Sequence, residues 1–233
     1  MFWALRGGGA GSWGVIIDAT FRTFPTFNAT VHTVDILTAT LDQTGDLMTT
    51  HAMHIKDWDA VRAGQVSTLI GSTSKSTLVL ITTFKDLDGD ASKAQMSSFL
   101  ADARALGAAV LEESTFTALA NDIVTAQDDA SGTNGILSSR LIPNSIYLNA
   151  PSNIGTAYKQ LLSQGFSEIL ELLVAGGEFP CHVFCPYTTL IVLVGQVAAN
   201  ANISSAIIPA WRSAKTHVSV LLNGPYCDFE TSG

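Results

Sequence analysis

The chain has 233 residues, of which 47% are hydrophobic and 14% are charged, and its formal net charge is −8. This composition supplies a substantial core and excludes a disordered chain. Only 12 Lys and Arg residues are spread along the acidic chain, which excludes nucleic-acid binding and a polybasic membrane contact. No apolar run reaches the roughly 18 residues that a transmembrane helix needs.

Alternating or β-branched runs predict strands in the first third of the chain, at 13–24, 28–37, 66–71 and 76–85. Pro25 should end the first of them, because proline cannot donate to a ladder. The helix-like spacing of Leu47, His54 and Trp58 predicts a helix over 41–63. This part of the chain is therefore expected to place one long helix between two pairs of strands.

The remaining two thirds of the chain mix both periodicities. Asp90 is expected to cap a helix over 91–106 that ends at Gly107, the usual position for a terminating glycine. Further helices are predicted at 115–125, 152–164 and 166–174, and further strands at 179–185, 188–199 and 214–222. Strand pairs alternating with longer helices predict an α+β fold, an antiparallel β-sheet covered by helices on one side.

Glycine is concentrated at the start of the chain, where it occupies five of the eight positions from Gly7 to Gly14. Glycine lets a backbone approach another group closely or adopt a positive φ, at an entropic cost. Consecutive backbone N–H groups there would favour the anionic part of a cofactor. The residue types alone are equally compatible with a tight turn that leads into a buried strand.

Three segments carry a family resemblance. Residues 2–15, FWALRGGGAGSWGV, closely resemble the FWALRGGGxGSWGV signature of the FAD-linked oxidases, the flavoproteins related to berberine bridge enzyme. Residues 137–145, LSSRLIPNS, are similar to the SRLIP segment of the fungal members. Residues 205–212, SAIIPAWR, together with His217, are similar to the NPAWR–H segment. The three segments occur in family order and span nearly the whole chain.

The resemblance implies a two-part organisation and a cofactor. Residues 1–27 would be the remnant of the end of a FAD-binding domain, and residues 28–233 would form a substrate domain with helices on one side of its sheet. The N-terminal FAD domain and the C-terminal segment of the family would then be missing. By resemblance, flavin contacts fall on eight residues of the opening segment: Gly7, Gly8, Gly9, Gly11, Ser12, Trp13, Gly14 and Val15.

The function implied by the resemblance is that of a FAD-linked oxidoreductase, an oxidase of small-molecule or secondary metabolism, present as a partial chain. A FAD-domain partner would have to supply the rest of the flavin site. The alternative is a flavin-free isomerase, cyclase or binding module, derived from the substrate domain and paired in a homodimer. A third reading is a truncated product without activity. Family members are often secreted, but no signal peptide is visible at the start of this chain.

Other polar residues give weaker signals, and no catalytic residue is assigned. His217 is a general base or an ordinary core histidine, and Arg140 and Arg212 tie loops together or clamp a substrate. His51 and His54 share a helical face, but no carboxylate completes a metal site there, and Cys181 and Cys185 lack the companions that structural zinc needs. The carboxylate pairs Glu112–Glu113 and Asp128–Asp129 are interpreted as solvated.

Overall fold

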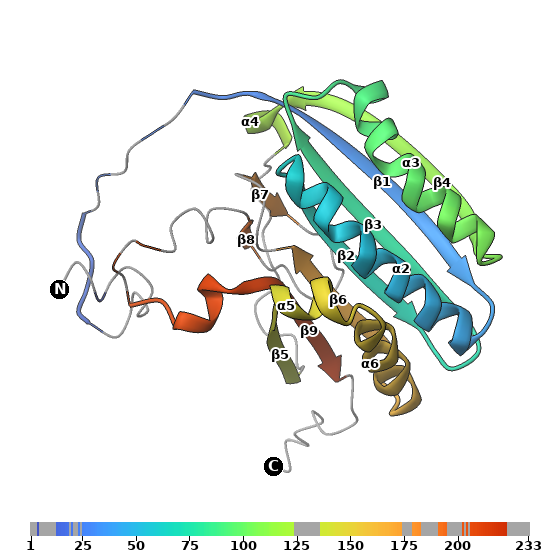
Figure 1. Cartoon of the computed structure of the whole chain (residues 1–233). Helices are drawn as coiled ribbons and strands as arrows, with labels where there is room; N and C mark the ends of the chain where they lie inside the picture. Colours follow the sequence, from blue (N-terminus) through green and yellow to red (C-terminus); the bar gives the residue numbers. More distant parts are fainter. Residues whose placement is uncertain are drawn as a thin grey trace, which may run out of the picture.

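A computed structural model describes most of the chain, with gaps (Figure 1). The described residues are 4, 13–18, 20, 23, 25–123, 136–173, 179–182, 191–194, 202, 204 and 206–222. Within them, seven strands form one antiparallel sheet in the order β4-β1-β3-β2-β6-β9-β5. In that order the strands are Ala109–Leu119, Asn28–Thr38, Ser76–Lys85, Gly64–Gly71, Glu168–Leu173, Ala214–Leu222 and Ile136–Pro143.

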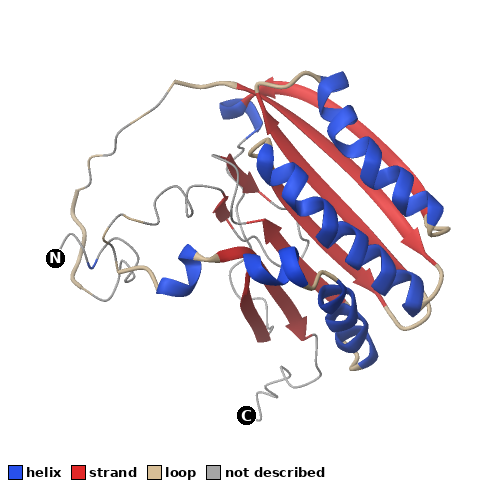
Figure 2. Ribbon diagram, viewed as in Figure 1, coloured by secondary structure: helices blue, strands red, loops and turns tan. Residues whose placement is uncertain are grey.

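The longer helices lie over one face of this sheet (Figure 2). They are α2 (Leu41–Ala60), α3 (Gly89–Ala105) and α6 (Ser152–Ser163), and the short helix α5 (Asn144–Asn149) lies beside α6. Shorter elements are the helix α4 (Ala120–Ile123), the 3₁₀ turn η2 (Pro209–Arg212) and a hairpin of β7 (Phe179–His182) and β8 (Ile191–Val194). The structure confirms the predicted fold class, an α+β layer with helices on one side.

The main core fills the space between the helices and the sheet. Trp58 of α2 and Phe99 of α3 are fully buried there against strand residues such as Leu80 and Phe84. Burying each such side chain contributes about 1.5–3 kcal/mol, so this layer is the chief source of stability. The spacing of Leu47 and Trp58 that predicted α2 marks the face of the helix that packs on the sheet.

Helices α2 and α6 approach each other closely because each has a glycine at the crossing point. A Cβ atom on Gly155 would clash with the backbone carbonyl of Gly45 and with the hydroxyl of Thr49. A Cβ on Gly45 would meet mainly the flexible side chain of Lys159. The close contact fixes α6, and with it the inner wall that α6 presents to strands β6, β9 and β5.

The other face of the sheet carries no helix layer in the described structure. Side chains alternate along each strand, so the neighbours of core residues point to this second, open face. Val66, Thr68 and Leu170 point there and are nevertheless buried. The hairpin β7–β8 contacts strands β2, β3 and β6, which places it over this part of the open face.

Within the described residues most predicted elements form, and four predictions are wrong; parts of the strands predicted at 179–185 and 188–199 lie outside those residues. Residues 109–119 are the strand β4 where a helix was expected over 115–125, and of the described residues in that range only 120–123 are helical. Residues 168–173 are the strand β6 where a helix was expected over 166–174. In both cases pairing with neighbouring strands overrides the local helical pattern.

The other two corrections concern the start of the chain and a helix cap. Residues 13–18 are not a strand, because no described strand takes up their backbone hydrogen bonds, and Ile17 is 96% exposed. Helix α3 begins at Gly89, two residues before the predicted start at 91. The side chain of Asp88, and not that of Asp90, accepts from the backbone N–H of Ala91. Gly107 follows the helix end with a φ of 79°, as predicted.

The described sheet has two edges, β4 and β5. β4 is 11 residues long and mostly exposed. Its pairing with β1 is interrupted by a register shift between Asp35 and Ile36. Two glutamates, Glu112 and Glu113, lie next to this irregularity.

Candidate functional site

The glycine-rich opening segment is only partly described. Gly7, Gly8, Gly9, Gly11 and Ser12, five of the predicted flavin contacts, lie outside the described residues. Trp13, Gly14 and Val15 are described, and the φ of Gly14 is 137°. A Cβ on Gly14 would meet nothing within 4 Å, so glycine is favoured here by backbone conformation and not by lack of space.

The described part of this segment fits a contact with a large, partly apolar group. Trp13 is 53% exposed and Val15 is 92% exposed. Such a run of exposed apolar side chains is unfavourable in water and is typical of surfaces that take part in binding. The positive φ of Gly14 turns the chain between the two.

His217 lies on the open face of the sheet. Its neighbours Thr216 and Val218 pair in register with residues that face the helices, so His217 points the opposite way. Its ring lies 5.3 Å from the indole of Trp211, which the 3₁₀ turn η2 brings back over the strand. The PAWR segment and the following histidine thus form one local unit.

The electrostatic setting of His217 suits a proton acceptor. Nδ1 is buried and has no hydrogen-bond partner in the described structure. Partial burial lowers the pKa of His217 below its ordinary value of 6.5, so the ring is neutral at pH 7. A neutral imidazole with a free ring nitrogen can take up a proton from a neighbouring group.

A second polar group on the open face is a carboxylate pair between two strands. Asp35 of β1 and Glu112 of β4 are directly opposite each other. Burial, and then the charge of Glu112, raise the pKa of Asp35. Glu113 faces the helix side, where its Oε1 lies 3.0 Å from Nε2 of His32. The two adjacent glutamates therefore face opposite sides of the sheet. The pairing of Glu112 with Asp35 was not predicted, because spacing within one segment does not reveal which residues lie opposite on a neighbouring strand.

The helix-facing side holds a buried polar cluster that was not predicted. Glu171 of β6 is 2% exposed, and both of its carboxylate oxygens accept from tyrosine hydroxyls. Oε1 accepts from Tyr147 of α5, and Oε2 accepts from Tyr158 of α6 at 2.7 Å. Tyr147 also lies 2.5 Å from Oγ1 of Thr216. Burial raises the pKa of both tyrosines, so both remain protonated donors.

His51 of α2 extends this cluster. Its Nε2 donates to Oε1 of Gln65 at 2.9 Å, since a carbonyl oxygen can only accept. Gln65 in turn donates to Thr82. Nδ1 of His51 is left without a hydrogen bond, 3.9 Å from Oε2 of Glu171. Burial is the largest influence on His51 and lowers its pKa, although the Glu171 carboxylate acts in the opposite direction.

We expect His51 to make the folded chain sensitive to mild acid. Because its folded pKa lies below the unfolded value of 6.5, the unfolded chain binds the proton first as the pH falls. Stability is therefore fully present above pH 6.5 and declines below it, by about 1.4 kcal/mol for each unit of pKa lowering. Urea unfolding of wild type and His51→Gln between pH 7.5 and 5 measures this decline. Equal slopes in the two proteins would contradict the assignment.

The remaining predicted residues do not converge on one site. His54 shares the helical face of His51 but lies 2.8 Å from Oδ2 of Asp102 on α3. Arg140 lies on the helix-facing side of β5, whereas Arg212 belongs to η2. Cys181 lies in β7. The other residues singled out, Asp128, Asp129 and Cys185, are outside the described residues. No helix in the described ranges is long and apolar enough to cross a membrane.

Solved structures with this fold include VAO-type flavoproteins, berberine bridge enzyme and aclacinomycin oxidoreductase. The chain matches the VAO-type flavoprotein MtVAO615 from Myceliophthora thermophila with a TM-score of 0.67 and 16% identity, over 94% of this chain and 37% of that one. It matches berberine bridge enzyme from Eschscholzia californica with a TM-score of 0.63 and 15% identity, over 95% and 41%. It matches aclacinomycin oxidoreductase with a TM-score of 0.57 and 16% identity, over 97% of this chain and 46% of that one.

These likenesses establish the fold, and they confirm the fold that the sequence resemblance implied. The chain spans 34–46% of the length of the solved structures it matches. No protein-family model matches the sequence, and no curated protein does.

Proposed function

We propose that this chain is the substrate-domain part of a FAD-linked oxidase that acts on a small molecule. The agreement of two independent findings supports the proposal. The opening signature and the two later segments resemble FAD-linked oxidases by sequence, and the same chain has the fold of such flavoproteins over 94–97% of its length. The first finding is local and chemical, whereas the second is global and geometric, so the two support each other.

In this proposal residues 1–27 belong to the end of a flavin-binding domain and residues 28–233 form the substrate domain. Two observations support the division. The sheet begins at Asn28, and residues 13–18 stay outside it with their apolar side chains exposed. A flavin domain, on the same chain or on a partner, would cover them.

The residues proposed to hold the flavin are Gly7, Gly8, Gly9, Gly11, Ser12, Trp13, Gly14 and Val15. Bound there, FAD would supply the hydride acceptor that the side chains of this chain lack. The open face of the sheet would bind the substrate and shield it from water. The ring of His217 would accept the substrate proton, and Trp211 would hold that ring in place.

The flavin role is tested by titrating FAD with the 233-residue chain and following flavin fluorescence. We expect saturable quenching by the wild type, and binding about tenfold weaker in Gly14→Val, because the added side chain strains a positive φ beside the cofactor. Gly165→Val is the matched control. Gly165 has a φ of 92°, and a Cβ there also meets nothing within 4 Å, but it lies at the end of α6.

Two outcomes would overturn the flavin role. FAD binding that both glycine variants weaken equally would point to loss of folding and not to loss of a contact. A chain that shows no saturable FAD binding would leave the flavin-free isomerase or cyclase reading in its place. Circular dichroism of both variants accompanies the titration, because each has to retain the fold for the comparison to hold.

A further inference from the structure

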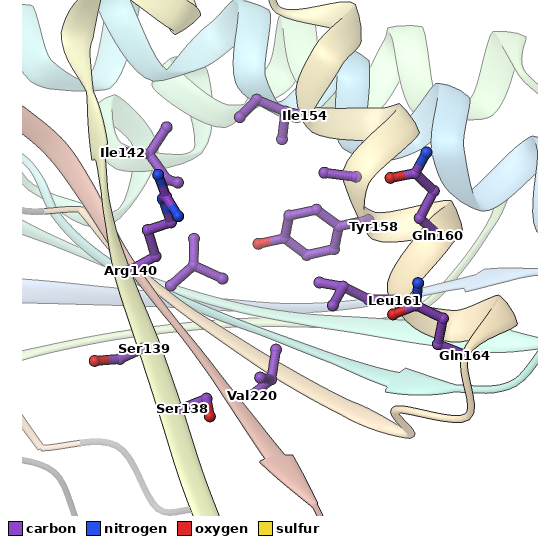
Figure 3. A pocket seen from close by; sticks show the side chains of 12 residues that line it. Ser138, Ser139, Arg140, Ile142, Ile154, Tyr158, Gln160, Leu161, Gln164 and Val220 are labelled. Atoms are coloured by element: carbon purple, nitrogen blue, oxygen red, sulfur yellow. The ribbon is translucent and has the colours of Figure 1, made fainter.

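A cavity of about 410 Å³ opens between helix α6 and the strands β5 and β9 (Figure 3). The apolar part of its strand wall is formed by Ile142, Val218 and Val220, and its helix wall includes Ile154 and Leu161. Val218 and Val220 alternate along β9 with His217 and Ser219. The cavity is therefore on the helix-facing side of the sheet, opposite the face proposed for the flavin and its substrate.

The width of the helix layer explains why the cavity exists. A helix with its side chains is about 10 Å across, and neighbouring strands are about 4.8 Å apart, so one helix covers roughly two strands. Helix α3 contacts β4 and β1, α2 contacts β1 and packs against α6, and the short helix α5 contacts one part of β9 and β5. Strands β9 and β5 extend past α6, and their apolar side chains line the open space.

Arg140 is the one charged side chain among the residues that line this cavity. It comes from the edge strand β5 and is exposed, and in the described structure it has no hydrogen bond or ion pair. Figure 3 shows its guanidinium next to Ile142, across the cavity from Gln160. An unpaired guanidinium beside an apolar wall is suited to a carboxylate that carries an apolar chain.

The inner wall of the cavity is held by a buried hydrogen bond. The ring of Tyr158 lines the cavity, and its hydroxyl donates to the buried Glu171 at 2.7 Å. Tyr158 itself is 3% exposed. A wall that is already ordered loses little entropy when a ligand binds, which favours affinity for small ligands.

We propose that this cavity binds a medium-chain fatty carboxylate. The carboxylate pairs with Arg140 and the alkyl chain lies between α6 and β9. The volume is near the lower end of the range for ligand pockets, about 300–1,000 Å³, which suits a single chain of moderate length. The lining holds no acidic side chain, so an alkyl amine of the same length is disfavoured by charge.

Isothermal titration calorimetry of the full chain with decanoate tests the proposal, with decanol and decylamine as comparison ligands. We expect saturable decanoate binding, and binding by decanol and by Arg140→Gln about tenfold weaker or more, because the charge-assisted hydrogen bonds are lost. Arg104→Gln, an exposed arginine in the last turn of α3, is the matched control and should bind normally.

A second variant separates the cavity from other surfaces. Ala157 lines the cavity and is exposed on α6, so Ala157→Trp should fill the space without disturbing the core, and should abolish binding. Decanoate binding that survives Ala157→Trp, or that is equal for decanol and for Arg140→Gln, would overturn the proposal, as would no saturable binding. Light scattering of the chain without ligand tests one further outcome that would overturn the proposal. If the chain is a dimer and Ala157→Trp dissociates it, the cavity binds a second copy of the chain. None of these outcomes depends on flavin binding.

Discussion

Replacing Glu171 with alanine is expected to destabilise the chain by about 3–5 kcal/mol, because two buried hydroxyls lose their acceptor at about 1–3 kcal/mol each. The carboxylate is 2% exposed and joins Tyr147 of α5 to Tyr158 of α6. No water can replace it without entering the layer between the helices and the sheet. The substitution therefore removes a link between three elements at once.

Urea unfolding followed by circular dichroism measures this effect. Tyr158→Phe removes one of the two donors and keeps the ring, so it should cost only about 1–2 kcal/mol. Glu112→Gln, an exposed glutamate on β4 of the same sheet, should stay within about 0.5 kcal/mol of wild type. A Glu171→Ala protein within 1 kcal/mol of wild type would show that the tyrosines find other partners.

Trp58→Ala is expected to cost about 3–5 kcal/mol, the usual range for removing a large aromatic from a core. Trp58 is fully buried, and its ring centroid lies 5.4 Å from Phe99 and 5.3 Å from His51. Its Nε1 donates to the backbone oxygen of Gln95 at 3.3 Å, so α2 and α3 are joined through this one side chain. Removing it leaves a cavity between the two helices.

The measurement again is urea unfolding, with Trp211→Ala as the matched control. Trp211 is only partly buried, outside the main core, and its loss should cost about 1 kcal/mol. Trp58→Phe should recover much of the lost stability, because it fills part of the cavity. Comparable losses for Trp58→Ala and Trp211→Ala would contradict the central place of Trp58 in the core.

The sequence predicts those elements whose pattern and packing agree. Leu47 and Trp58 are spaced for one helix face, and α2 buries that face. The β-branched run 76–85 forms the central strand β3. Residues 168–173 were misread because Leu170, Leu172 and Leu173 are also good helix formers. Only the ladders with β2 and β9 make this segment a strand, and those partners are distant in sequence.

The candidate sites likewise differ in whether a local sequence pattern or contacts between distant segments define them. His217 was singled out from the PAWR–H resemblance, and the structure adds its orientation and its contact with Trp211. The Glu171 cluster was invisible to sequence reasoning, because its members come from α5, α6, β6 and β9 and no local spacing relates them. The cavity at Arg140 was missed for a similar reason: it depends on how far α6 reaches across the sheet.

The long exposed edge strand β4 has a consequence for association between copies of the chain. Among the described strands this edge of 11 residues has no outer neighbour, and such an edge is a template on which a second edge can add. In a symmetric pairing, Glu112 and Glu113 of both copies would crowd into the middle of the new ladder, so that four carboxylates repel one another. The bulge beside Asp35 also bends the edge away from a flat geometry. This edge is thus protected from self-assembly by its own charge and shape.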